Sequence, residues 1–140
     1  MVKYKRMRLI ALIVMATCLS LTSKAQEVKI YQANQVTVKA AYKNGTGDIM
    51  TYVSSNFKQP FMCILDKVKT TFRIRFVVNE DGSLSNVTVI GCDVEGSCCQ
   101  DMNAACEDLL KEMNGWKPAE VKGELVKQWV EIPMNVNNAG

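Results

Sequence analysis

Cysteine is the residue type whose number and spacing in this chain could support chemistry. The 140 residues include six cysteines and no histidine. The lack of histidine excludes Cys-His nucleophilic catalysis, a Ser-His-Asp triad and every zinc site that uses histidine. What remains open is thiol, disulfide or all-cysteine metal chemistry.

The cysteine spacing does not favour redox or metal chemistry. Cys98 and Cys99 are adjacent at the expected start of a helix, where the helix dipole lowers a thiol pKa. A thioredoxin-type site needs Cys-x-x-Cys, and an all-cysteine metal site needs paired knuckles of that kind, so a thiol-based redox or metal-binding protein is the least favoured reading. Isolated carboxylates such as Asp66, Asp93 and Glu95 form no paired acid/base set. We therefore predict no enzyme, no catalytic residue, no cofactor and no bound metal.

A structural role for the cysteines is preferred. Cys92 lies in a loop just before the helix, so we predict one local disulfide from Cys92 to either Cys98 or Cys99. Cys63 and Cys106 are expected to be buried and reduced. Five cysteines follow residue 25, and because five is odd, at least one thiol is free or pairs between chains.

The first 25 residues have the order of a secretory signal peptide. Basic residues come first, an apolar run from Leu9 to Leu21 follows, and Ser23-Lys24-Ala25 offers small residues before a cut. We predict cleavage after Ala25 and export to an oxidising compartment, which permits disulfides. The alternative is an uncleaved segment that anchors the chain to the membrane. Without residues 1–25 the chain has 12 basic and 14 acidic residues, so we expect no nucleic-acid partner.

A hairpin is the clearest element of the remaining chain. Apolar Phe72, Ile74 and Phe76 alternate with Arg73 and Arg75, the period of a strand with one buried face. Asp81-Gly82 supplies a turn, because Gly adopts positive φ at little cost. A second strand through Val87 and Val89 follows, and the hairpin is expected over residues 71–90.

A helix and a closing strand complete the predicted core. Apolar residues recur at helical spacing over 99–113, at Met102, Cys106, Leu109, Leu110 and Met113. Ser97 and Gln100 fit a capping box before it, and Gly115 ends it. Residues near 125–135 form the last strand, and Pro133 argues for an edge position because proline cannot donate to a ladder. Residues 48–56 suit a short helix, and Pro60 opens another helical turn through Leu65.

These elements, in this order, resemble the C-terminal domain of TonB in the form found in Bacteroidetes. The resemblance covers residues 42–136. It rests on the segments Tyr42–Gly45, Ile49–Asn56 with Pro60, Phe76–Leu84, Met113–Ala119, Gly123 and Ile132–Met134. It divides the chain into a signal peptide (1–25), an N-terminal extension with a peripheral strand (26–41) and a free-standing exported domain (42–140).

The resemblance implies a fold and a binding mode. The fold is α+β, with a small antiparallel sheet of about three strands and two helices packed on one face. The closing strand is expected to bind an extended peptide by strand addition. The expected partner is a periplasmic segment of an outer-membrane receptor or of another envelope protein, with the membrane involved only through such transport partners. The site residues are Val126, Gln128, Val130, Ile132 and Met134.

Two other roles stay open beside peptide binding. The chain is either a structural envelope protein with no transport role or a homodimer joined through the same strand.

A proline at Val130 is expected to weaken peptide binding, because it would delete a donor from the ladder.

Overall fold

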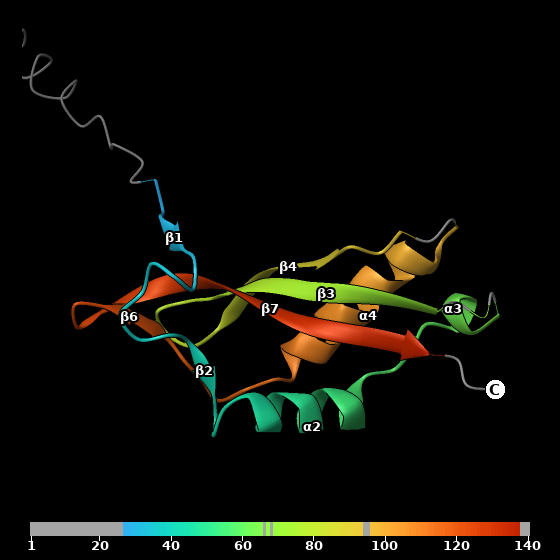
Figure 1. The fold of residues 1–140 in the computed structure, drawn as a ribbon, viewed down its shortest axis with the longest axis horizontal. Coiled ribbons are helices and arrows are strands. Elements are labelled where there is room, and N and C mark those ends of the chain that lie inside the picture. Colours follow the sequence, from blue (N-terminus) through green and yellow to red (C-terminus); the bar gives the residue numbers. More distant parts are fainter. Residues whose placement is uncertain (1–26, 66, 68, 94–95, 138–140) are drawn as a thin grey trace, which may run out of the picture.

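The computed structural model of the chain describes residues 27–65, 67, 69–93 and 96–137 (Figure 1). The predicted signal peptide falls outside these residues. The described part has an α+β fold in which three long strands form the centre of a sheet. They are β3 (Lys69–Val78), β4 (Leu84–Ile90) and β7 (Glu124–Asn137).

The central strands pair as the sequence predicts. β3 lies between β4 and β7, and both pairings are antiparallel. The β3–β7 ladder runs without a register shift from Lys69 opposite Asn137 to Val78 opposite Gln128. The predicted antiparallel sheet of the hairpin and the closing strand is confirmed.

Two short strands also pair with β7. β6 (Ala119–Val121) forms a hairpin with its start, and β1 (Ile30–Tyr31) pairs parallel with Lys127 and Gln128. β1 therefore adds a parallel pairing to the three antiparallel strands that the sequence predicted. β2 (Ala41–Tyr42) and β5 (Trp116–Lys117) form a separate two-stranded sheet.

Three helices occupy the described part of the chain. α2 (Thr46–Asn56), α3 (Phe61–Leu65) and α4 (Cys98–Lys111) each lie close to a predicted helical segment. Ser97 precedes α4 but makes no side-chain capping bond, so the predicted capping box is wrong. None of these helices has the length and apolar composition needed to span a membrane.

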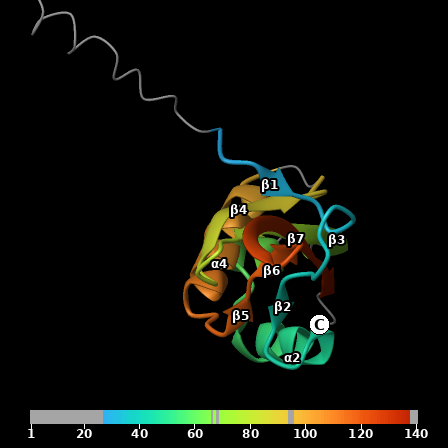
Figure 2. The same ribbon diagram turned by 90° about the vertical axis from the view of Figure 1, so that its left-hand side faces the viewer.

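The helices and the sheet share one hydrophobic core. The Tyr52 hydroxyl of α2 donates to the carbonyl oxygen of Leu109 in α4 at 3.3 Å, which ties the two helices together on one face of the sheet. Figure 2, seen from the end at which β1 and β6 lie, shows α2 and α4 against the sheet. The buried side chains of this core include Phe72, Ile74 and Phe76 of β3, Ile132, Met134 and Val136 of β7, Val53 of α2, and Met102, Cys106, Leu109 and Leu110 of α4.

Candidate functional site

The two edges of β7 differ along their length. One edge pairs with β3 over residues 128–137. On the opposite edge, β1 pairs with residues 127–128, while β6 pairs with residues 124–126 at the very start of the strand. From Trp129 onward, no strand among the described residues pairs with this second edge. β7 therefore has strands on both sides at Gln128 and a free edge from Trp129.

Pro133 indicates which backbone groups face the open edge. Proline has no N–H, so within a paired strand it sits where its nitrogen points away from the ladder. The N–H and C=O groups of one strand residue point to the same side, and successive residues alternate. The backbone groups of Trp129, Glu131, Pro133 and Asn135 therefore face the open edge. Val130 alternates with them and faces β3, opposite Phe76.

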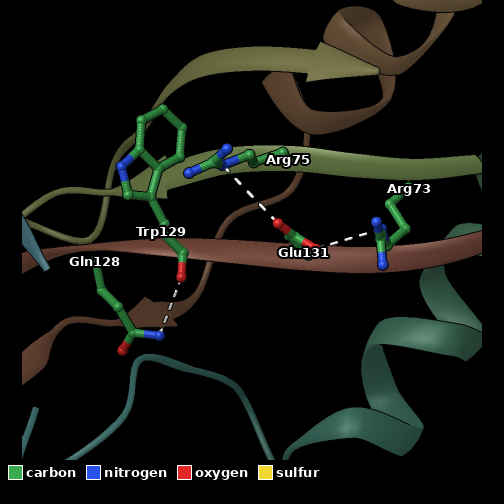
Figure 3. Close-up of polar contacts among 5 residues, drawn as sticks. All are labelled: Arg73, Arg75, Gln128, Trp129 and Glu131. Carbon is green, nitrogen blue, oxygen red and sulfur yellow. Dashed lines mark hydrogen bonds and ion pairs between the residues drawn. The ribbon is translucent and has the colours of Figure 1, made fainter. Parts of the chain in front are cut away.

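Gln128 marks the point where the open edge begins. Its side chain is 3 % exposed, and its Oε1 accepts a hydrogen bond from the backbone N–H of Ala40 at 2.8 Å. Its Nε2 donates to the carbonyl oxygen of Trp129 at 3.2 Å, which also places that carbonyl on the open side (Figure 3). The buried amide thereby holds the segment before β2 beside β7, at the point where the open edge begins.

A cavity of about 450 Å³ lies along the open edge. Its floor is the edge of β7 from Gln128 to Pro133, and the start of α2 forms one wall with Thr46, Ile49 and Met50. Met50 is 45 % exposed there, so part of the wall is apolar and open to solvent. The rest of the lining comes from Gln32, Ala33, Lys39, Ala40 and Trp116. We call this cavity and the adjoining edge the β7 groove.

Trp116 joins the groove to the core. It is 6 % exposed, and its ring lies 5.5 Å from Tyr42 and 5.3 Å from Phe76, between ring centroids. Its indole Nε1 is buried and has no hydrogen-bond partner among the described residues. Buried indole donors usually find a partner, so Trp116 brings an unused polar group to the wall of the groove.

The solvent-facing side of the β7 groove carries charge and an aromatic ring. Glu131 pairs with Arg73 at 3.4 Å and with Arg75 at 3.9 Å, and the guanidinium carbon of Arg75 lies 4.3 Å from the centre of the Trp129 ring. Figure 3 shows these side chains on the opposite side of β7 from Gln128. A strand laid along the open edge would have one face against this cluster and the other against the apolar wall.

The five residues predicted for peptide contact are placed differently from the open edge. Val126 pairs with Ala119 of β6, and Gln128 has partner strands on both sides. Gln128, Ile132 and Met134 have buried side chains, and Val130 is half-buried. These side chains lie on the core side of β7, whereas the backbone groups that face the open edge belong to the alternate residues. The alternation of residues in the sequence indicated which side chains face the core. It did not indicate which backbone groups face the open edge.

The cysteines form two bridges that meet at the start of α4. Cys92 bonds to Cys99, one of the two pairings expected from the sequence. Cys63 bonds to Cys98, so the prediction that Cys63 is reduced is wrong. The sequence missed this pairing because it depends on α3 lying against α4, 35 residues further along the chain. Cys106 is free and buried, as predicted, and burial raises the pKa of its thiol to about 12.

The described residues contain no group of three or more metal-ligating side chains.

No family model matches the sequence, and no curated protein matches it.

Two solved structures resemble this one in part. Both are TonB C-terminal domains. They are solution NMR structures of a longer and a shorter piece of the protein from Helicobacter pylori, with 22 % and 20 % sequence identity to this chain. They cover 66 % and 67 % of this chain and 78 % and 94 % of their own, each with a TM-score of 0.46. A likeness at this level assigns no function, so a function for this chain has to rest on the geometry of the β7 groove.

Proposed function

We propose that this protein is an envelope protein-binding module that holds an extended peptide of a partner protein along residues 129–135 of β7. The observation that carries the proposal is the unpaired edge of β7 beside a cavity of about 450 Å³. An open edge offers main-chain hydrogen bonds, and a neighbouring pocket offers selectivity for alternate side chains.

The composition of the groove fits an extended peptide better than a small polar ligand. Ile49, Met50 and Trp116 form an apolar wall beside a row of backbone donors and acceptors. A peptide strand satisfies both at once, because its backbone completes the ladder while every second side chain enters the wall. Pro133 interrupts the donor row, which limits open-ended association with further strands.

The partner we propose is a segment of an outer-membrane receptor or another envelope protein, which gives the module a part in transport. The two disulfides support export, because such bridges persist in oxidising compartments such as the periplasm. The partner class comes from the resemblance of the sequence to the TonB C-terminal domain.

We also propose that the module has no catalytic activity. Four of the five cysteines after residue 25 are in disulfides, and Cys106 is a buried thiol with a raised pKa. A nucleophilic cysteine needs an accessible thiolate, which burial opposes. The absence of histidine removes the usual general base.

A peptide titration tests the proposed binding mode. The chain from Gln26 to Gly140 is titrated with receptor-derived peptides, and backbone amide shifts are followed by NMR. We expect the largest shifts at Trp129, Glu131 and Asn135 and at the α2 wall. Peptides that are N-methylated at alternate residues should bind in one register and fail in the other, because only one set of amides faces β7.

A matched pair of variants separates backbone from side-chain effects. Glu131→Pro removes an outward N–H without touching the β3 ladder, whereas Glu131→Ala removes only the side chain. Binding should fall by about tenfold with proline, about one hydrogen bond, and change little with alanine. Shifts confined to the start of α4 would reject the proposal. Peptide-independent dimers joined through residues 129–135 would favour the homodimer instead.

A further inference from the structure

α3 presents an apolar surface that the fold does not use. Within its five residues only Cys63 is buried. The other four side chains are exposed: Phe61 at 69 %, Met62 at 38 %, Ile64 at 48 % and Leu65 at 56 %. Contiguous exposed apolar side chains of this kind usually mark an interaction site. We call these four residues the α3 tip.

The outward direction of the α3 tip is enforced by covalent and backbone contacts. The Cys63–Cys98 disulfide fixes α3 to the first residue of α4. The N–H of Ile64 donates to the carbonyl oxygen of Pro60 at 3.3 Å, and the N–H of Lys67 donates to that of Ile64 at 3.2 Å. Because Cys63 points inward to its bridge, its apolar neighbours on the other sides of the helix face solvent.

The position of the α3 tip favours a broad surface over a small ligand. α3 stands at one end of the long axis of the molecule, beside the last residues of β7 (Figure 1). β1 and β6 lie towards the opposite end, and no residue of α3 lines the β7 groove. A helix at the end of a molecule can touch a flat surface without disturbing the rest of the fold.

The charges of the segment around α3 are mainly positive. Residues 58–69 contain three lysines, Lys58, Lys67 and Lys69, and one acidic residue, Asp66. All three lysines are exposed. Asp93 and Asp101 are the described acidic residues that lie close in sequence to Cys92, Cys98 and Cys99, and both are exposed. Exposed apolar side chains flanked by lysines match the chemistry of an anionic lipid surface.

We propose that the α3 tip is a shallow membrane anchor for anionic lipid. The four apolar side chains enter the boundary between headgroups and acyl chains, and the flanking lysines contact headgroup phosphates. The contact is weak and reversible, since burial is limited to one helical turn. The β7 groove is left free to bind its peptide while the module rests on the lipid surface.

Vesicle sedimentation tests the anchor. The chain from Gln26 to Gly140, which contains every described element, is mixed with vesicles of phosphatidylcholine alone or with phosphatidylglycerol. We expect sedimentation with the anionic vesicles and a loss of binding as salt is raised. The double variant Phe61→Ser/Ile64→Ser should reduce the bound fraction by about tenfold, because interfacial affinity scales with buried apolar area. Lys67→Glu/Lys69→Glu should abolish the preference for anionic lipid.

A matched control distinguishes binding through the α3 tip from nonspecific binding through other exposed apolar residues. Val38 and Leu125 are 49 % and 51 % exposed and lie outside α3. Val38→Ser/Leu125→Ser removes two other exposed apolar side chains and should leave vesicle binding unchanged. Retention of both disulfides and of thermal stability shows that each variant is folded.

Three results would overturn the anchor. They are no sedimentation of the wild-type chain with anionic vesicles, equal losses in the two double variants, or a dimer that Phe61→Ser/Ile64→Ser abolishes, which would make the tip an interface between copies. Peptide binding to the β7 groove should be unaffected by Phe61→Ser/Ile64→Ser. The two proposals therefore succeed or fail separately.

Discussion

At the scale of single residues, Gly82 is a position where both the backbone conformation and the packing require glycine. Its φ is +81°, and an added Cβ would lie 2.6 Å from the carbonyl oxygen of Trp116. Trp116 also forms a wall of the β7 groove. The hairpin turn is therefore pressed directly against the segment that lines the proposed binding site.

Gly82→Ala should destabilise the protein by about 2–3 kcal/mol, because backbone strain and a clash with a main-chain atom add together. Gly91 is a matched control, with a φ of +78° and nothing within 4 Å of an added Cβ. Gly91→Ala should cost only the strain, about 1 kcal/mol. Urea denaturation of both variants measures the difference, and equal losses would show that the contact with Trp116 is unimportant.

The same turn holds an ionised carboxylate. The Ser83 hydroxyl and backbone N–H both donate to Oδ1 of Asp81, at 2.6 and 2.9 Å, and these bonds lower the pKa of Asp81 below its ordinary value. A carboxyl group with a lowered folded-state pKa stabilises the fold above its unfolded pKa. That contribution is lost as the pH falls through the folded value.

We expect an NMR titration to give Asp81 a pKa below that of an unpaired aspartate. Ser83→Ala removes the side-chain donor and should move the value back towards normal. An Asp81 pKa that does not respond to Ser83→Ala would contradict the assignment.

At the scale of elements, α4 is the helix whose burial decides stability. Leu109 is 6 % exposed and lies in the shared core with Leu110 and Cys106. Asn103 accepts a hydrogen bond from the N–H of Val89 at 2.7 Å, which fixes α4 to β4. The apolar face of the helix and this hydrogen bond both attach it to the sheet.

Leu109→Ala should destabilise the protein by about 2–5 kcal/mol, the range for a leucine removed from a packed core. Glu107→Ala, on the exposed side of the same helix, should change stability by less than about 0.5 kcal/mol. Thermal and urea unfolding of the two variants provide the comparison. Similar small changes in both would mean that α4 does not pack through Leu109.

The elements that the sequence predicted are those with a strong period. Alternation located β3 and β4, helical spacing located α4, and Pro60 marked the start of α3. The sequence predicted a peripheral strand within residues 26–41 but could not place β1 at Ile30–Tyr31, because two residues carry no period and the parallel pairing joins segments far apart in the chain. Nor could it show that the open edge starts at Trp129. That boundary depends on Gln128, a buried amide that bonds to the backbone of Ala40, 88 residues away in the chain, and to that of Trp129.

At the scale of the whole molecule, the described fold begins after the predicted signal peptide. β1 lies at Ile30–Tyr31, a few residues beyond the expected cut after Ala25. We expect the mature protein isolated from the cell envelope to start at Gln26, as read by N-terminal sequencing. A mature form that keeps Met1 would support the anchored alternative instead.

The Cys63–Cys98 bridge also determines how the molecule would carry mechanical load. It joins residues 35 apart in sequence and encloses the whole β3–β4 hairpin in a covalent loop. Tension applied between the chain ends passes through the sulfur atoms and bypasses that hairpin. In single-molecule pulling, the oxidised chain should extend about 120 Å less than the reduced chain, at roughly 3.4 Å for each enclosed residue. A partner that pulls on β7 could therefore not extend the β3–β4 hairpin while the bridge is intact.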